Sequence, residues 1–221
     1  RQQTIPINQQ LDNLLQQQIA KNREIMKSLF KTVILCGRNN FALRGRRDDD
    51  PRNESLQGNF QALLTFRIDS GDRVLEEHLQ NAPRNATYVS KTIQNEMIAV
   101  VGKFITDHLS REIRESRYFS ILADEAADVS NKENLSVVIR YVDETKTIRE
   151  EFLGFYLCEE GTAGVAIKNI IVKAVADLGL SMDDCRGQCY DGAGNMAGRL
   201  NGASSLITQS HPKAIYVHCM K

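Results

Sequence analysis

The first half of the chain has the hydrophobic periodicity of α-helices. Apolar residues recur at steps of three and four over Leu11–Ile34, which predicts one long amphipathic helix that ends near Gly37. The same spacing predicts a shorter helical region over Gln57–Arg67 and Asp72–Leu79, with a break at Ser70-Gly71. The N-terminal part of the protein is therefore expected to be helical.

A third helix is expected after a linker over Asn81–Tyr88, which contains Pro83. Ser90 is a suitable N-cap, because its hydroxyl can accept a hydrogen bond from a backbone N–H of the first turn. The apolar stripe of this helix consists of Ile93, Met97, Val100, Val101, Phe104, Ile105, Leu109 and Ile113. We therefore predict a helical N-terminal region that spans residues 1–116.

At Tyr118 the pattern changes to the shorter period of β-strands. The expected strands are Tyr118–Asp124, Leu135–Val142, Ile148–Leu157, Arg186–Tyr190 and Ala214–Cys219. Short links make the first three an antiparallel meander, whereas helices over 161–179 and Ala203–Gln209 separate the later strands. A right-handed helical crossover makes the fourth strand parallel to the first. The sequence thus predicts an α/β fold with a mixed sheet, in the order β-β-β-α-β-α-β.

Two of the apolar runs end at a carboxylate. The first reads YFSILAD and ends at Asp124, and the second reads CRGQCYD and ends at Asp191. If the two strands are adjacent and parallel, both aspartates lie at one edge of the sheet. Pairs of carboxylates bind hard divalent cations, which in turn hold phosphate oxygens. The pattern therefore raises the hypothesis of a divalent-metal site.

Structural roles can also explain these residues. Asp191-Gly192 fits an ordinary turn, and Asp124 fits a cap or a carboxylate at a strand end. Glu125 and Asp128 are interpreted as solvated loop residues. By the pattern alone, the ordinary turn is the favoured role of Asp191-Gly192.

The five cysteines are Cys36, Cys158, Cys185, Cys189 and Cys219. Their odd number and scattered spacing do not indicate a disulfide framework, so reduced and mostly buried thiols are expected. A zinc site formed by Cys185, Cys189, His218 and Cys219 is an alternative, although the usual close CxxC pairs are absent.

The charge balance argues against a general affinity for nucleic acid. The chain has 28 basic and 28 acidic residues, so its formal net charge is zero. Arg44, Arg46 and Arg47 form a local basic patch that could contact phosphate, with a solvated, self-neutralising loop as the alternative. Weak DNA binding without sequence preference is therefore expected. No apolar stretch reaches the ~20 residues of a membrane span, so no membrane partner is expected.

Two segments resemble the catalytic segments of a transposase superfamily. Phe119–Ser130, which reads FSILADEAADVS, resembles the first-aspartate segment of the hAT superfamily, the hobo and Activator group. Gly187–Gly198, which reads GQCYDGAGNMAG, resembles its second-aspartate segment, and Tyr216–Cys219 resembles the strand that follows. The resemblance is strongest to transposon-derived proteins described as zinc-finger MYM-type-like, whose helical region also precedes the catalytic fold.

The resemblance implies a ribonuclease-H-like domain over residues 117–221, truncated at its C-terminus. It implies that Asp124 and Asp191 are the first two catalytic acids and ligands of Mg²⁺ or Mn²⁺, with a third acid, a Glu, downstream of Lys221. The implied reaction is metal-dependent DNA strand cleavage and transfer in the nucleus. Because this fragment has two of the three acids, it is expected to be inactive alone.

The main alternative is a domesticated, non-catalytic nuclear module that uses the same fold to bind protein or DNA, including a second copy of itself. A Glu on a downstream helix would favour the enzyme, and its loss would favour the domesticated module. A third interpretation takes Asp191–Gly198 as a Gly-rich nucleotide loop, but the lysine of the GxxxxGK[ST] motif is absent.

Overall fold

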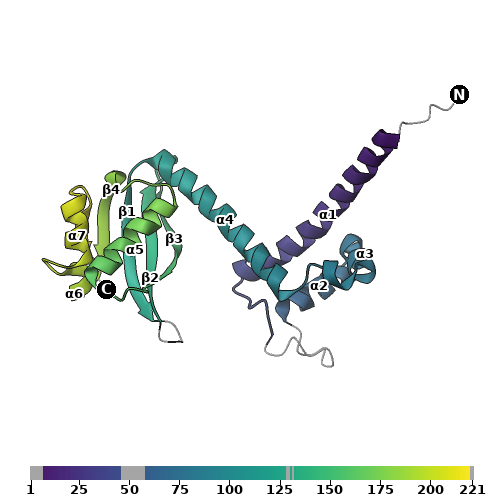
Figure 1. The fold of residues 1–221 in the computed structure, drawn as a ribbon, viewed down its shortest axis with the longest axis horizontal. Helices are drawn as coiled ribbons and strands as arrows, with labels where there is room; N and C mark the ends of the chain where they lie inside the picture. Colours follow the sequence, from purple (N-terminus) through teal and green to yellow (C-terminus); the bar gives the residue numbers. More distant parts are fainter. Residues whose placement is uncertain (1–6, 46–57, 128–129, 131, 220–221) are drawn as a thin grey trace. The chain divides into compact units, whose positions relative to one another are not determined.

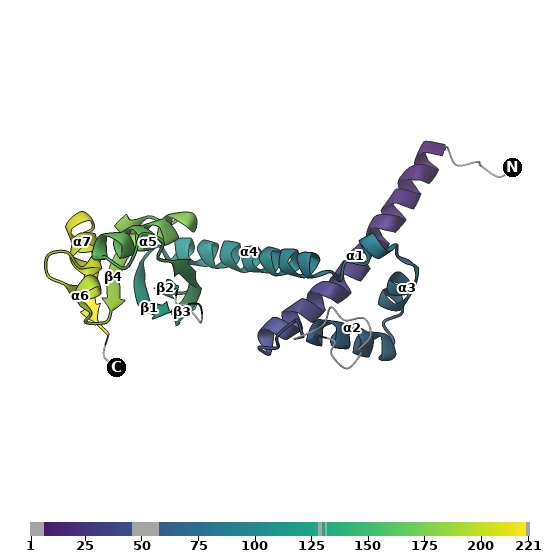
Figure 2. The same ribbon diagram turned by 60° about the horizontal axis from the view of Figure 1, so that its bottom comes forward.

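The chain folds into two compact units that divide within one helix. A computed structural model describes residues 7–45, 58–127, 130 and 132–219. The contacts separate Arg1–Gly102 from Lys103–Lys221, so the division falls inside α4 (Lys91–Ser116) (Figure 1, Figure 2). This division lies earlier than the predicted domain boundary at 116/117, because Ile113, near the end of α4, is fully buried in the core of the sheet unit.

The helical unit contains the helices that the periodicity predicted. They are α1 (Ile7–Arg38), α2 (Asn59–Asp69), α3 (Arg73–Asn81), the short 3-10 helix η2 (Arg84–Ala86) and the first turns of α4. Ser90 caps α4 as expected, since its Oγ accepts a hydrogen bond from the backbone N–H of Ile93 at 3.3 Å. The core of this unit consists of Ile25, Leu29, Val33, Phe60, Leu64, Leu75 and Met97. The four-residue spacing of Ile25, Leu29 and Val33 places them on one face of α1.

A charged cluster joins α1, α2 and the start of α3. The Asp72 carboxylate is the N-cap of α3 and accepts a hydrogen bond from the Leu75 N–H at 3.2 Å. Ser28 of α1 donates to the same carboxylate at 2.7 Å, and Arg67 of α2 pairs with it at 2.7 Å. Burial by itself would raise the pKa of Asp72, but the hydrogen bonds from Ser28, Arg67 and Leu75 and the charge of Arg67 outweigh it and lower the pKa.

Replacing Asp72 by Ala is expected to lower the free energy of unfolding of the helical unit by about 2 kcal/mol, because it removes a cap and the acceptor of charged hydrogen bonds. The pKa of Asp72 is lowered in the folded state, so its contribution is present above the unfolded-state pKa and is lost as the pH falls below about 4. Urea denaturation at neutral and acidic pH measures both effects. The exposed Asp69→Ala is the control, and equal losses in the two variants would contradict the prediction.

The sheet unit has the predicted order of elements. Its strands are β1 (Phe119–Ala127), β2 (Glu133–Val142), β3 (Ile148–Leu157), β4 (Cys185–Tyr190) and β5 (Ile215–His218). The sheet order is β3-β2-β1-β4-β5, with β1, β2 and β3 antiparallel and with β1, β4 and β5 parallel. The predicted meander, the parallel fourth strand and the α/β class are thus confirmed.

Four helical segments connect the later strands. They are α5 (Gly164–Asp177), the 3-10 helix η3 (Met182–Asp184), the four-residue α6 (Gly194–Ala197) and α7 (Ala203–Ser210). The helices α5 and α7 correspond to the predicted ones, whereas α6 was not predicted. Figure 1 shows α5 lying across the strands as the crossover between β3 and β4.

The alternation of side chains gives the sheet a covered face and an open face. The covered face packs on α5 and the end of α4, and its buried strand residues are Phe119, Ile121, Ala123, Leu135, Val137, Ile139, Tyr141, Cys185 and Tyr190. The open face carries the intervening residues, among them Leu122, Asp124, Val138 and Cys189. Candidate chemistry on the open face is therefore accessible, whereas the covered face forms the core.

Candidate functional site

Asp124 lies on β1, Asp191 directly follows the adjacent parallel strand β4, and both line one pocket. In the pairing of β1 with β4, Leu122 lies opposite Cys189. Asp124 is two residues after Leu122, and Asp191 is two residues after Cys189. Since side chains alternate along a strand, both aspartates point to the same open face as this pair. The pocket has a volume of about 200 Å³ and is lined by Leu122, Ala123, Asp124, Ser136, Val138, Cys189, Asp191 and Cys219.

The two aspartates differ in their relation to the strand ends. β4 ends at Tyr190, directly before Asp191, as the sequence predicted. The prediction that β1 ends at Asp124 is wrong, because β1 continues to Ala127 through its pairing with β2. Asp124 is therefore a residue within a strand, paired with Ser136.

Hydrogen bonds hold the backbone around both carboxylates. The Asp191 Oδ1 accepts a hydrogen bond from the Ala193 N–H at 3.1 Å, which closes the turn expected for Asp191-Gly192. The Tyr216 hydroxyl of β5 donates to the Asp191 carbonyl at 3.2 Å. On the other strand, the Ser136 hydroxyl donates to the Asp124 carbonyl at 3.0 Å, so it does not engage the carboxylate. The turn uses one carboxylate oxygen of Asp191, and the other remains available to a ligand.

The donor set fits a hard divalent cation, since carboxylate oxygens are the ligands that Mg²⁺ and Mn²⁺ prefer. Within the described residues, no group of three or more His, Cys, Asp or Glu side chains is arranged to hold a metal ion. A cation between Asp124 and Asp191 would therefore complete its coordination with water, with phosphate oxygens or with a group from elsewhere in the full-length protein.

A comparison with protein families matches residues 1–202 to DUF4371, described as "ZMYM1/FAM200, RNase-like domain". The match covers both units of the chain. The chain belongs to this family.

Two curated relatives of this RNase-like domain carry the name "52 kDa repressor of the inhibitor of the protein kinase". The relative from Homo sapiens is 36% identical over 200 residues, which is 90% of this chain and 26% of the relative. The relative from Mus musculus is 34% identical over 216 residues, which is 96% of this chain and 28% of the relative. The chain thus spans about a quarter of the length of these relatives.

A third carboxylate of the RNase-like domain lies near the aspartate pair. Glu125 was interpreted as a solvated loop residue, but it belongs to β1 and is half-buried. The Asn195 amide donates to the Glu125 carboxylate at 2.8 Å and to the Thr162 carbonyl at 2.9 Å. Burial raises the pKa of Glu125, nearby carboxylates including Asp124 act in the same direction, and the hydrogen bond from Asn195 opposes the rise. Asn195 therefore ties the segment after β4 to the strand that carries Asp124.

Two glycines of the segment after β4, Gly198 and Gly202, pack closely against backbone, which explains them without a nucleotide. A Cβ at Gly198 would lie 2.3 Å from the Gly194 carbonyl oxygen, and a Cβ at Gly202 would lie 2.3 Å from the Gly198 nitrogen. A Cβ at Gly192 would lie 2.9 Å from the His218 ring. Only glycine permits the two approaches to backbone, whereas the side chain of His218 can shift to make room at Gly192. The interpretation of Asp191–Gly198 as a nucleotide loop therefore has no support from the packing.

The zinc alternative for this RNase-like domain is wrong, because Cys185 lies on the covered face, away from Cys189 and Cys219, and the described residues contain no group of three or more ligands arranged to hold a metal. The register shifts where β1 meets β4, so that Phe119 pairs with Cys185 but Ser120 pairs with Gly187. This bulge places Cys185 in the core, where its thiol donates to the Gly187 carbonyl at 3.2 Å, and leaves Cys189 on the open face.

The predicted basic patch is only partly within the described residues. Arg44 is exposed and donates to the Lys91 carbonyl at 3.2 Å and to the Asn95 amide oxygen, so its guanidinium is engaged within the helical unit. Arg46 and Arg47 lie outside the described residues. DNA contact through this patch stays a prediction.

Among the described helices, none is both long and apolar enough to cross a membrane.

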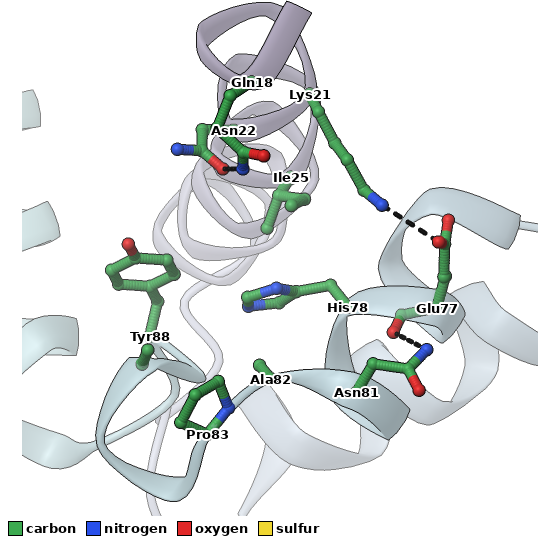
Figure 3. A pocket seen from close by; sticks show the side chains of 11 residues that line it. Gln18, Lys21, Asn22, Ile25, Glu77, His78, Asn81, Ala82, Pro83 and Tyr88 are labelled. Carbon is green, nitrogen blue, oxygen red and sulfur yellow. Dashed lines mark hydrogen bonds and ion pairs between the residues drawn. The ribbon is translucent and has the colours of Figure 1, made fainter. Parts of the chain in front are cut away.

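Figure 3 shows another pocket, of about 320 Å³, which lies between α1 and α3 in the helical unit. Lys21 pairs with Glu77 at 2.9 Å on one side of it. The rings of His78 and Tyr88 stack with their centroids 5.6 Å apart on the other side. Lys21 and Glu77 therefore pair with each other, and the two rings pack on each other, within the wall of the pocket. The pocket does not offer the paired aspartates found on the sheet.

Proposed function

We propose that this RNase-like domain derives from a hAT-type transposase, and that Asp124 and Asp191 hold a divalent cation, Mg²⁺ or Mn²⁺, for DNA strand cleavage and transfer by the full-length protein in the nucleus. The observation that carries the proposal is that one pocket is lined by the carboxylates of Asp124, on β1, and Asp191, directly after the adjacent parallel strand β4. The RNase-like description of the family supports it. Strands position such groups more accurately than loops do.

The contribution of the protein to this chemistry would be positioning. When bound, the cation would stabilise the charge that develops on phosphoryl oxygens. Pairing of β1 with β2 fixes the backbone of Asp124, and the hydroxyl of Tyr216 together with the turn at Ala193 fixes that of Asp191. The pocket lies on the open face, where a phosphate group can reach both carboxylates.

A complete site requires more ligands than this part of the protein supplies. The chain spans about a quarter of its curated relatives, so a third acid from the remainder of the protein would complete the coordination. We therefore propose that the chain alone binds a cation weakly, binds DNA weakly through local basic groups, and does not cleave DNA.

Cation binding tests the site directly. Mn²⁺ titration of the wild-type chain, followed by electron paramagnetic resonance, is expected to show one weak site. Asp124→Asn and Asp191→Asn are each expected to weaken it by roughly 10-fold or more, because loss of a ligand should exceed the effect of typical outer-shell changes. The control is Asp177→Asn, since Asp177 is exposed at the end of α5, before β4 begins. Equal affinity in wild type and both site variants would refute the metal role.

A second candidate function is a domesticated, non-catalytic module that binds protein or DNA in the nucleus. The name of the human and mouse relatives, a repressor, favours it, as does the zero net charge of the chain. This candidate retains the fold but requires no cleavage. A DNA titration at two salt concentrations measures the affinity of the chain for DNA. Weak and salt-sensitive binding is expected.

A further inference from the structure

Two of the five cysteines share the pocket with the aspartates. Cys36, Cys158 and Cys185 are buried, whereas Cys189 is half-buried and Cys219 is exposed. Cys189 and Cys219 both line the pocket on the open face. Neither thiol has a role in the proposed cation chemistry, because Mg²⁺ and Mn²⁺ prefer oxygen ligands.

The pairing of β4 with β5 brings the two thiols together. Cys189 lies opposite Val217, and Cys219 is two residues further along on the same face. The Cys219 N–H donates to the Tyr190 carbonyl at 2.9 Å, which keeps Cys219 against β4 although it lies beyond the end of β5. Both side chains line the same pocket, so the two thiols are neighbours on the open face.

We propose that Cys189 and Cys219 form an oxidation site that a peroxide converts into an intrachain disulfide. The exposed Cys219 thiolate attacks a peroxide oxygen, which breaks the O–O bond and gives a sulfenic acid and hydroxide. The Cys189 thiolate then attacks the sulfenic sulfur, forms the S–S bond and releases a second hydroxide. The two thiol protons convert both hydroxides into water. In total, two thiols and one hydrogen peroxide give one disulfide and two waters.

The disulfide would control access to the aspartate pocket. Asp191 is two residues from Cys189, and the crosslink would hold the chain after β5 across the wall of this pocket. This consequence rests on the proposed function, whereas formation of the disulfide does not. The oxidised chain is expected to bind Mn²⁺ about tenfold more weakly than the reduced chain, the size of effect typical of changes next to metal ligands.

Peptide mapping tests the disulfide. The reduced chain is treated with hydrogen peroxide, then denatured, blocked with an alkylating agent and digested with trypsin without reductant. Cleavage after Arg186, Arg199 and Lys213 places Cys185, Cys189 and Cys219 in three different peptides. We expect a crosslink between the peptides over 187–199 and 214–221 that dithiothreitol removes, with the three buried cysteines still alkylated as internal controls. Sulfinic acid at Cys219 without a crosslink, or a crosslink between two chains, would overturn the proposal.

The variant Cys189→Ser adds a kinetic test. Without a second thiol, the sulfenic acid at Cys219 is expected to progress to sulfinic acid, whereas the wild type stops at the disulfide. If circular dichroism shows that this variant does not fold, the wild-type map decides the question.

Mn²⁺ binding separates the two proposals. A disulfide without Mn²⁺ binding by the reduced chain would remove the metal site only, and Mn²⁺ binding without a disulfide would remove the oxidation site only. A disulfide that leaves the Mn²⁺ affinity unchanged would remove the control of the pocket.

Discussion

Asp124→Asn and Asp191→Asn are each expected to abolish DNA cleavage in a full-length protein that supplies a third acid. Asn keeps the shape of the side chain but removes the negative charge that holds the cation. Metal ions contribute several kcal/mol of transition-state stabilisation, so the loss of rate is expected to be roughly 10³-fold or more. A nicking assay on DNA that carries the terminal repeats of the element measures it, with circular dichroism to verify folding.

The same assay separates the two candidate functions. Asp177→Asn is the control and is expected to cleave like the wild type. Cleavage by either site variant would exclude these aspartates as metal ligands. A folded, full-length wild type that does not cleave would establish the domesticated module instead. The 221-residue chain alone is expected to give no product in Mg²⁺ or Mn²⁺.

Gly164→Ala is expected to lower the free energy of unfolding of the sheet unit by about 2–3 kcal/mol. Gly164 is the first residue of α5, and a Cβ there would lie 2.0 Å from the Asn201 carbonyl oxygen and 2.9 Å from the Asn195 carbonyl oxygen. These atoms belong to the backbone of the segment that follows the second aspartate, so they cannot move aside as a flexible side chain would. Urea denaturation followed by circular dichroism measures the loss.

The matched control is Gly194→Ala. Gly194 is also the first residue of a helix that follows an alanine N-cap, but no atom lies within 4 Å of the position of its Cβ. Here alanine is expected to leave stability unchanged or to raise it by about 0.5 kcal/mol, because it restricts the unfolded chain. A similar loss of stability in both variants would show that the close packing at Gly164 is not the cause.

Most of the fold follows from local patterns in the sequence. The three- and four-residue spacing of apolar side chains predicted α1, α2, α3 and α4, and the change at Tyr118 predicted the strands and their order. Such patterns are informative because one face of each element must be buried. The buried residues therefore recur along the sequence with the period of the helix or strand. They do not report how far a strand continues once its residues become polar, so the end of β1 and the role of Glu125 were missed. The helix α6 was missed because its four residues are too few to show a periodic pattern.

For the candidate site too, part was predictable from the sequence and part depended on the tertiary structure. The sequence by itself determined which residues could act: two aspartates after apolar runs, and cysteines with no framework. Only the tertiary structure decided which of them meet. Pairing of β1 with β4 places Asp124 and Asp191 in one pocket, a bulge in β4 separates Cys185 from Cys189, and pairing with β5 brings Cys219 to Cys189. The physical reason is that a shift of one residue in strand register moves a side chain to the opposite face of the sheet, and register depends on contacts between segments that are distant in the sequence.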